Sequence, residues 1–177
     1  MCPDVRPHPP AVLPLAAELA DFIGGAVSIS LGSCGAGLVP NLTRGLGCRV
    51  SADRRRLRVW LAASASAALL ADVAANATLA MVCSLPATHR TVQLKTRDAR
   101  IGALEAGDRD CVARYRAAFV GGLEALGYPA AVMSMLVAAT DEDLAAIDFT
   151  PHAAFVQTPG PAAGALLVAA GGEGHAP

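Results

Sequence analysis

The polar segment from Thr88 to Ile101 carries the side chains of this sequence that are best suited to bind an anion. Side chains alternate between the two faces of an extended strand, which divides this segment into two sets. One face carries His89, Thr91, Gln93 and Lys95, and the other carries Arg90, Val92 and Leu94. A strand this polar, in a chain dominated by Ala, Val and Leu, is either an exposed edge or the wall of a polar ligand site.

Two further arginines, Arg44 and Arg49, lie on an earlier candidate strand, and with Arg90 they favour the ligand site. Guanidinium groups bind phosphate through paired hydrogen bonds, so three of them suit a phosphate. The spacing of Arg44 and Arg49 places them on opposite faces of a regular strand. A bulge at Gly45 or Gly47 would bring them together. Without a bulge, the alternative is that they are solvated or ion-paired surface residues.

The imidazole of His89 makes this residue a candidate general acid or base. The sequence offers it no Ser or Cys nucleophile with an orienting carboxylate, so we expect a donor in a ligand site or at its rim. No residue is predicted to be catalytic. The basic run Arg54-Arg55-Arg56 lies in a predicted turn and is expected to be solvated.

Several elements must position these residues, and short strands dominate them. Helices are predicted over 14–23, where Gly24-Gly25 forms a C-cap, and over 64–75, 108–126 and 129–137. Strands are predicted over 26–31, 38–46, 48–51, 57–61, 77–84, 88–101, 143–149 and 153–157. The chain from residue 158 onward is rich in Gly, Pro and Ala and is predicted to be mostly non-regular.

This order of elements indicates a mainly β (α+β) fold, in which antiparallel hairpins form a small barrel with peripheral helices. We expect a Pro-rich disordered tail over 1–12 and a single domain over 13–160 with a helical insert at 108–137. A flexible Gly/Pro/Ala-rich tail is expected over 161–177. The glycines Gly32, Gly35 and Gly37 lack the G-x-G-x-x-G spacing, which argues against a Rossmann sheet.

Composition excludes several classes of protein. In 177 residues, 54% are hydrophobic and 16% charged, and the net charge of −1 offers no bulk attraction to nucleic acid or acidic membranes. No segment is expected to be a signal peptide or a membrane span. The five cysteines form no CxxC and no metal-spaced cluster, so mostly buried, reduced thiols in a cytoplasmic protein are expected.

Several motifs, in this order, resemble the pyridoxamine 5′-phosphate oxidase-like, FMN-binding split-barrel proteins, particularly their uncharacterised bacterial branch. The motifs are Arg44-Gly-Leu-Gly-Cys-Arg49, Arg58-Val-Trp60-Leu, Ala63-Ser64-Ala-Ser66-Ala-Ala-Leu-Leu, His89-Arg90-Thr91 and the ending Phe149-Thr-Pro-His-Ala-Ala-Phe-Val-Gln157-Thr-Pro-Gly-Pro161. The resemblance covers roughly residues 14 to 104 and extends more weakly to the tail. It implies a split β-barrel of the FMN-binding type.

The resemblance also implies a cofactor and a set of residues that bind it. Arg44 and Arg49 would border the flavin phosphate and ring edge, and Ser64 and Ser66 would contact the phosphate from a helix N-terminus. Thr91 and its neighbours would approach the flavin ring across the interface of a homodimer. The expected FMN-binding residues are Arg44, Gly47, Arg49, Trp60, Ser64, Ser66, His89, Arg90, Thr91 and Gln93. The alternative for Trp60 is a place in the core, where a lone Trp on a barrel strand is more often found.

Three functional hypotheses remain open. The first is a cytoplasmic, homodimeric FMN-dependent oxidoreductase of unknown substrate. The second is a non-enzymatic binding module for haem, a deazaflavin or no cofactor, because Ala65 and Ser66 stand where FMN-binding members often carry an Arg-Lys pair. The third is haem handling with His89 or His152 as an axial ligand.

Overall fold

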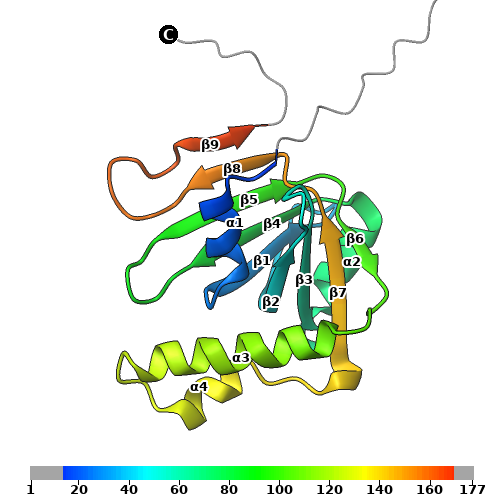
Figure 1. The fold of residues 1–177 in the computed structure, drawn as a ribbon. Coiled ribbons are helices and arrows are strands. Elements are labelled where there is room, and N and C mark those ends of the chain that lie inside the picture. Colours follow the sequence, from blue (N-terminus) through cyan, green and yellow to red (C-terminus); the bar gives the residue numbers. More distant parts are fainter. Residues whose placement is uncertain (1–13, 170–177) are drawn as a thin grey trace, which may run out of the picture.

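The structure is a computed structural model that describes residues 14–169, and the predicted tail over 1–12 lies outside them. One antiparallel sheet of nine strands, in the order β6-β7-β3-β2-β1-β4-β5-β8-β9, curves into an open barrel (Figure 1). The strands are β1 (Ser28–Cys34), β2 (Pro40–Val50), β3 (Leu57–Ala62), β4 (Leu79–Ser84), β5 (Thr91–Thr96), β6 (Arg100–Gly102), β7 (Leu144–Phe149), β8 (Ala153–Val156) and β9 (Leu166–Ala169).

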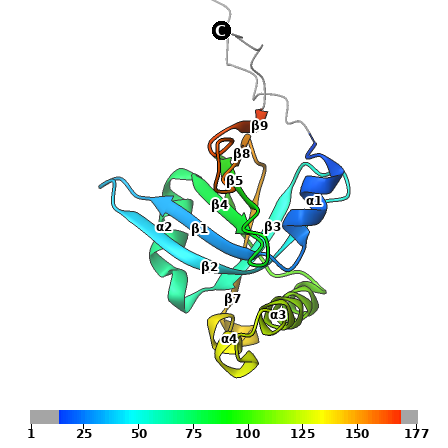
Figure 2. The ribbon, with the colours of Figure 1, turned by 90° about the vertical axis from the view of Figure 1, so that its left-hand side faces the viewer.

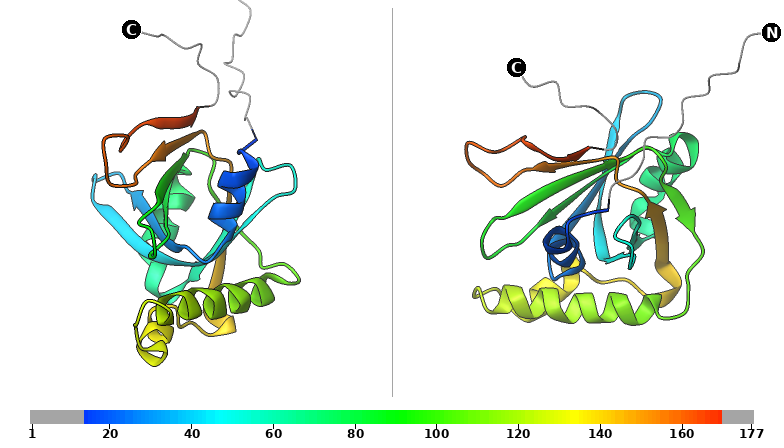
Figure 3. Two further views of the ribbon diagram at one scale, coloured as in Figure 1. Left: turned by 60° about the vertical axis from the view of Figure 1, so that its left-hand side comes forward. Right: turned by 45° about the horizontal axis from the view of Figure 1, so that its top comes forward.

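Four α-helices lie at the periphery of this sheet. They are α1 (Ala17–Gly24), α2 (Ala67–Asn76), α3 (Asp108–Glu124) and α4 (Ala130–Leu136), with short 3₁₀ turns η1 (Ser64–Ser66) and η2 (Asp141–Asp143). α2 packs against β1 and β2, while α1 and α3 pack against other parts of β2 (Figure 2). α4 folds back against α3 to form a helical hairpin at one end of the barrel (Figure 3).

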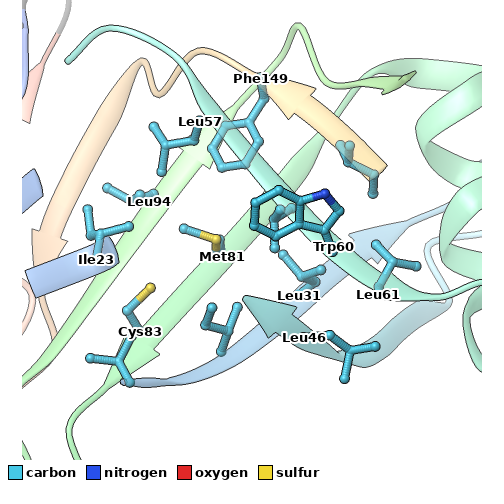
Figure 4. Packing of buried hydrophobic residues seen from close by; sticks show 14 of the residues in the cluster. Ile23, Leu31, Leu46, Leu57, Trp60, Leu61, Met81, Cys83, Leu94 and Phe149 are labelled. Carbon is cyan, nitrogen blue, oxygen red and sulfur yellow. The ribbon is translucent and has the colours of Figure 1, made fainter. Parts of the chain in front are cut away.

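The core lies inside the curved sheet and follows from the alternation of the strands. In β1, β4 and β5 every second residue is buried, as with Ile29 and Leu31 of β1. Trp60 of β3 is 1% exposed and packs among Leu31, Leu57 and Met81 (Figure 4). Trp60 therefore belongs to the core, which was the alternative to flavin stacking.

The predicted bulge in β2 is confirmed. The register between β2 and β3 shifts between Gly45 and Cys48, and Gly47 has a φ of +129°. This conformation is open to glycine and strained for other residues. Because the strand continues through the bulge, the segments predicted over 38–46 and 48–51 form the single strand β2.

The predicted strand over 88–101 is two strands. His89 has a φ of +58°, and its N–H donates to the carbonyl of Leu85, so it lies in the β4–β5 turn. A second turn follows β5, where Thr96 Oγ1 donates to Asp98 Oδ1 at 2.6 Å. The strand predicted from sequence therefore began too early and missed the turn between Thr96 and Arg100, because local hydrogen bonds favour turns at both places.

The predicted non-regular tail is wrong for residues 166–169, because β9 pairs with β8 there. Residues 158–165 of that tail form no helix or strand, and residues 170–177 lie outside the described part of the chain. Of the four cysteines within 14–169, which are all unpaired, Cys83 is buried, Cys48 and Cys111 are half-buried and Cys34 is exposed. Within the same residues, no helix is long and apolar enough to cross a membrane.

Candidate functional site

A cavity of about 660 Å³ lies between α1, β2 and α3, and we call it the α1–β2–α3 cavity. Its volume falls in the range of small-molecule sites. Small residues form much of its wall, which leaves room for a ligand; they are Ala17, Ala20, Gly24, Gly25, Ala26 and Ala118. Its charged lining residues are Asp21, Arg49, Arg54 and Arg114. Three guanidinium groups thus face one carboxylate, and the excess charge favours an anion.

The chain holds the α1 wall of this cavity with a main-chain contact. Leu15 N–H donates to the carbonyl of Arg54 at 2.9 Å, which ties the start of α1 to the β2–β3 turn. α1 then ends at Gly24, and the N–H of Gly25 bonds the carbonyl of Phe22. The β2–β3 turn therefore brings Arg54 to the side of α1, although the two are far apart in sequence.

α3 forms the opposite wall because Tyr115 packs tightly on the β2 bulge. A Cβ added at Gly47 would lie 3.1 Å from Tyr115 Cβ and 3.4 Å from Trp60 Cε3. The Tyr115 hydroxyl donates to the carbonyl of Val27 at 2.8 Å, and burial raises the pKa of Tyr115. The phenol therefore remains protonated and fastens α3 to the chain entering β1. Gly47 therefore allows this close approach of a helix.

Arg49 is the residue of the cavity that also belongs to an ion-pair network. Its Nη2 lies 2.8 Å from Glu105 Oε2, its Nη1 lies 3.4 Å from Asp108 Oδ1, and its Cζ lies 5.8 Å from the Trp60 ring centroid. Partial burial opposes the charge, but the hydrogen bond with Glu105 and the charges of Asp108 and Glu105 raise the pKa of Arg49. Its side chain is 41% exposed, so it retains access to the cavity.

The ion-pair network continues into the barrel wall, where a second arginine is almost fully buried. Arg58 is 5% exposed, and its Nη2 donates to the carbonyl of Ala103 at 2.6 Å. It pairs with Glu105 at 2.5 Å and with Asp148 at 3.2 Å, and Asp108, which is 0% exposed, lies 3.7 Å from its Nε. We call Arg49, Arg58, Glu105, Asp108 and Asp148 the Arg58 network. It fixes the start of α3 on β2 and β3.

Arg54 and Arg114 are less engaged than Arg49. Arg54 is half-buried in the β2–β3 turn with a φ of +57°, and Arg114 is exposed on α3, where its Nη2 lies 3.1 Å from Cys111 Sγ. A thiol is a weak hydrogen-bond acceptor, so this contact holds the guanidinium loosely. Within residues 14–169 neither guanidinium pairs with a carboxylate, so both charges can bind an incoming anion.

Three of the predicted cofactor residues share the outward face of the sheet. Arg44 lies opposite Ser30, which lies opposite Val82, and Val82 in turn lies opposite Gln93. Thr91 lies on the same face. Arg44 Nη1 lies 3.2 Å from Ser28 Oγ, and Thr91 Oγ1 lies 2.7 Å from Ser84 Oγ. The bulge does not unite Arg44 with Arg49 at the cavity, because Arg44 is not among the residues that line it.

Three other predicted cofactor residues are buried. Gly47 lies beneath Tyr115, Trp60 is in the core, and Ser66 is 2% exposed. The Ser66 and Thr43 hydroxyl groups are 2.7 Å apart and satisfy each other. A buried hydroxyl with a protein partner has little capacity left for a phosphate.

The last three predicted cofactor residues, apart from Arg49, have protein partners or lie in a turn. A carboxylate occupies the site predicted for phosphate at Ser64, because its N–H and Oγ donate to Asp143 at 2.8 and 2.7 Å. Arg90 pairs with Glu18 at 3.0 Å, and its Cζ lies 4.5 Å from the Phe22 ring centroid, so it holds α1. His89 is exposed in the β4–β5 turn.

The sequence prediction missed Arg54 and Arg114, which line the cavity together with Arg49. Arg54 was expected to be solvated, and Arg114 was not singled out, because its helix carries charges on several faces. The signal on α3 was the i, i+3, i+4 set of Cys111, Arg114 and Tyr115, whose side chains lie along one side of a helix. Among residues 14–169, no three His, Cys, Asp or Glu side chains are grouped as a metal site requires.

No protein-family model and no curated protein matches this chain. Solved structures do. The HupZ protein of Group A Streptococcus is 15% identical and covers 85% of this chain and 99% of its own, with a TM-score of 0.51. A candidate pyridoxamine 5′-phosphate oxidase from Lactobacillus delbrueckii is 11% identical. It covers 80% of this chain and 93% of its own, with a TM-score of 0.50. The chain thus has the fold of the pyridoxamine 5′-phosphate oxidase-like split barrels, as predicted.

Proposed function

We propose that this chain binds FMN in the α1–β2–α3 cavity and uses it in redox chemistry on a substrate that is still to be identified. The observation that carries the proposal is the surplus of guanidinium groups around a cavity of about 660 Å³. Arg49, Arg54 and Arg114 would bind the phosphate. Of the residues predicted from sequence to bind FMN, this proposal keeps Arg49. It assigns the phosphate to Arg54 and Arg114 in place of Ser64 and Ser66.

The neutral walls of the cavity support this assignment. Burial, reinforced by the nearby Cys83, raises the pKa of Cys48 well above its usual value. The thiol is therefore uncharged at neutral pH, as is the phenol of Tyr115, and neither repels an anion. When bound, the flavin supplies the hydride or electron transfer, while the chain binds it, orients it and limits its contact with water. No residue is required as an acid or base.

We also propose that the protein acts as a homodimer in the cytoplasm. The outward face of β1 and β4 is lined by small side chains, which allow a second sheet to approach closely. The β1–β2 hairpin beside it exposes Leu38, Val39 and Leu42, at 83%, 65% and 78%. Large exposed apolar side chains in a group are typical of interfaces. Unpaired thiols agree with a reducing compartment. Light scattering on the wild type and on Leu42→Asp tests the dimer, which should dissociate in the variant.

A fluorescence titration tests the cofactor. Purified protein is titrated with FMN up to about 100 μM, and saturable quenching of flavin fluorescence is expected, with a matching rise in melting temperature. Arg114→Ala should weaken binding about tenfold or more, because each charged hydrogen bond contributes about 1.5–3 kcal/mol. Arg56→Ala is the control, since it removes the same charge from the exposed β2–β3 turn outside this cavity. If FMN produces no quenching and no thermal shift with the wild type, the FMN proposal fails.

A second candidate function is a non-enzymatic binding module for haem, a deazaflavin or another anion. The contact of Asp143 with Ser64 favours it, because the helix N-terminus that was expected to hold the flavin phosphate already has an intramolecular carboxylate. The absorbance spectrum of the purified protein distinguishes the candidates. Flavin bands support the first function, whereas a Soret band or a spectrum without cofactor bands supports the second.

A further inference from the structure

A second cavity, of about 340 Å³, lies at the end of β1, β4 and β5, on residues that the proposed FMN site does not use. We call it the His152 cavity. Its basic residues are Lys95, Arg97 and His152, and none of its ten described lining residues is acidic. The other polar lining residues are Ser33, Cys34, Thr78 and Thr96. Two fixed positive charges and an imidazole thus line a cavity without a carboxylate.

The sheet itself brings these basic groups together. His152 N–H donates to the carbonyl of Lys95 at 2.9 Å, immediately before Ala153 pairs with Lys95 in the register of β5 and β8. Lys95 Nζ lies 5.0 Å from the Phe155 ring centroid, which supports the lysine from the next strand. Arg97 follows the end of β5 by one residue and is exposed. The positions of Lys95 and His152 therefore depend on strand pairing.

His152 carries the most direct sign of a ligand. Its Nδ1 is buried and has no hydrogen-bond partner within the described residues. Such atoms are uncommon in folded proteins and call for a partner. Three charged groups act on the ring, namely Lys95 of β5 and Arg97 and Asp98 of the following turn, and Cys34 lines the same cavity at the end of β1. Asp98 is already bonded to Thr96 Oγ1 and to the N–H of Thr150.

We propose that the His152 cavity binds a phosphate group, either as inorganic phosphate or as the phosphate of a small monoester. Lys95 and Arg97 supply charged donors, and His152 supplies a third. This site goes beyond the proposed FMN function and shares no residue with the α1–β2–α3 cavity. In the absence of the anion, desolvation and the charges of Arg97 and Lys95 lower the pKa of His152, and Asp98 opposes them only in part. A bound anion reverses this balance and favours the protonated ring.

Proton NMR of the imidazole rings tests the proposal, because the chain has only four histidines. His152→Asn identifies the resonance of His152. The full chain is titrated with potassium phosphate near pH 6.5 and, separately, with phenyl phosphate, against potassium chloride at equal ionic strength. We expect a saturable shift of the His152 resonance and a higher pH midpoint for its titration. Tighter binding of phenyl phosphate identifies a monoester ligand, and tighter binding of inorganic phosphate identifies the free ion.

Substitutions separate this site from the FMN site. Arg97→Ala, at an exposed position, should weaken phosphate binding about tenfold, and Lys95→Ala should do the same. Arg49→Ala should leave it unchanged, while Arg97→Ala should leave FMN binding unchanged. The proposal is overturned if chloride reproduces the shift, if the His152 midpoint does not move, or if Arg97→Ala binds phosphate as the wild type does.

Discussion

Arg49 and Arg58 lie opposite each other on β2 and β3, yet they belong to regions with opposite charge balance. Arg58 is surrounded by the carboxylates of Glu105, Asp108 and Asp148. On the other side of Arg49, the α1–β2–α3 cavity places Arg54 and Arg114 near a single carboxylate of its lining, Asp21. The difference shows that the number of arginines does not mark an anion site. The carboxylates that the fold brings to each arginine decide whether it is structural or free to bind.

The largest expected effect is on stability and follows the loss of Arg58. Arg58→Ala leaves the half-buried Asp148 without its cation and removes one of the two cations of the fully buried Asp108, which keeps Arg49. Removing one partner of a buried ion pair typically costs about 3–5 kcal/mol. Urea denaturation should show a loss of that order. Arg100→Ala, which removes an exposed arginine from β6, should stay within about 0.5 kcal/mol of the wild type.

A small loss of stability in Arg58→Ala would contradict the contrast between the two regions, because Arg58 would then be as weakly held as the arginines of the cavity. Burial also raises the pKa of Asp148, against the lowering by Arg58. Its protonated form is therefore favoured as the pH falls, and removal of Arg58 should raise this pKa further. Titration of the Asp148 carboxyl by NMR checks that direction independently of stability.

Gly47→Ala should have the next largest effect. The backbone at this position has a φ of +129°, and the added Cβ would lie 3.1 Å from Tyr115 Cβ. Strain at such a conformation and a tight packing contact together cost about 2–4 kcal/mol. Gly121→Ala in α3 is the matched control, since a Cβ there meets nothing within 4 Å, and it should stabilise the helix slightly. Unchanged stability with lost FMN affinity would restore Gly47 as a residue that approaches the cofactor.

The barrel was predictable from sequence because strand alternation and turn residues are local signals. The alternation of Thr91 to Lys95 and the bulge near Gly45 and Gly47 were visible for that reason. The partners of each arginine were not, because Arg58 meets Glu105 only after β3 and the start of α3 have been brought together. The contact of Ser64 with Asp143 joins residues 79 positions apart and carries no local signal. Tail residues 166–169 form β9 because β8 offers a free edge, which composition does not reveal.

Arg49→Ala tests the residue that the two regions share. Its ion pairs are partly exposed, so we expect a loss of stability of no more than about 1 kcal/mol, well below that of Arg58→Ala. FMN affinity should fall about tenfold, because the cavity loses one of its charged donors. Chemical denaturation and fluorescence titration of the same preparation separate the two effects. A large loss of stability with unchanged affinity would assign Arg49 wholly to the Arg58 network.

The smallest expected effect concerns Asp143, whose carboxylate occupies the start of η1. Hydrogen bonds from the Ser64 side chain and then its N–H lower the pKa of Asp143 below its usual value. A carboxyl whose pKa is lower in the folded state than in the unfolded state stabilises the fold above the unfolded pKa of about 3.9. This contribution to stability is lost as the pH falls through the pKa of the folded state. Asp143→Asn should therefore melt slightly below the wild type at pH 6, and the difference should shrink below pH 3.

The control for this variant is Asp110→Asn, which removes the same charge from an exposed position on α3. FMN affinity gives the decisive measurement. If the phosphate binds among Arg49, Arg54 and Arg114, then Asp143→Asn leaves the affinity unchanged, because the η1 turn and the cavity involve different residues. A clear rise in affinity would mean that Asp143 competes with the phosphate for the N–H and hydroxyl of Ser64. The anion site would then lie where the sequence first indicated it, and the surplus of arginines around the cavity would need another ligand.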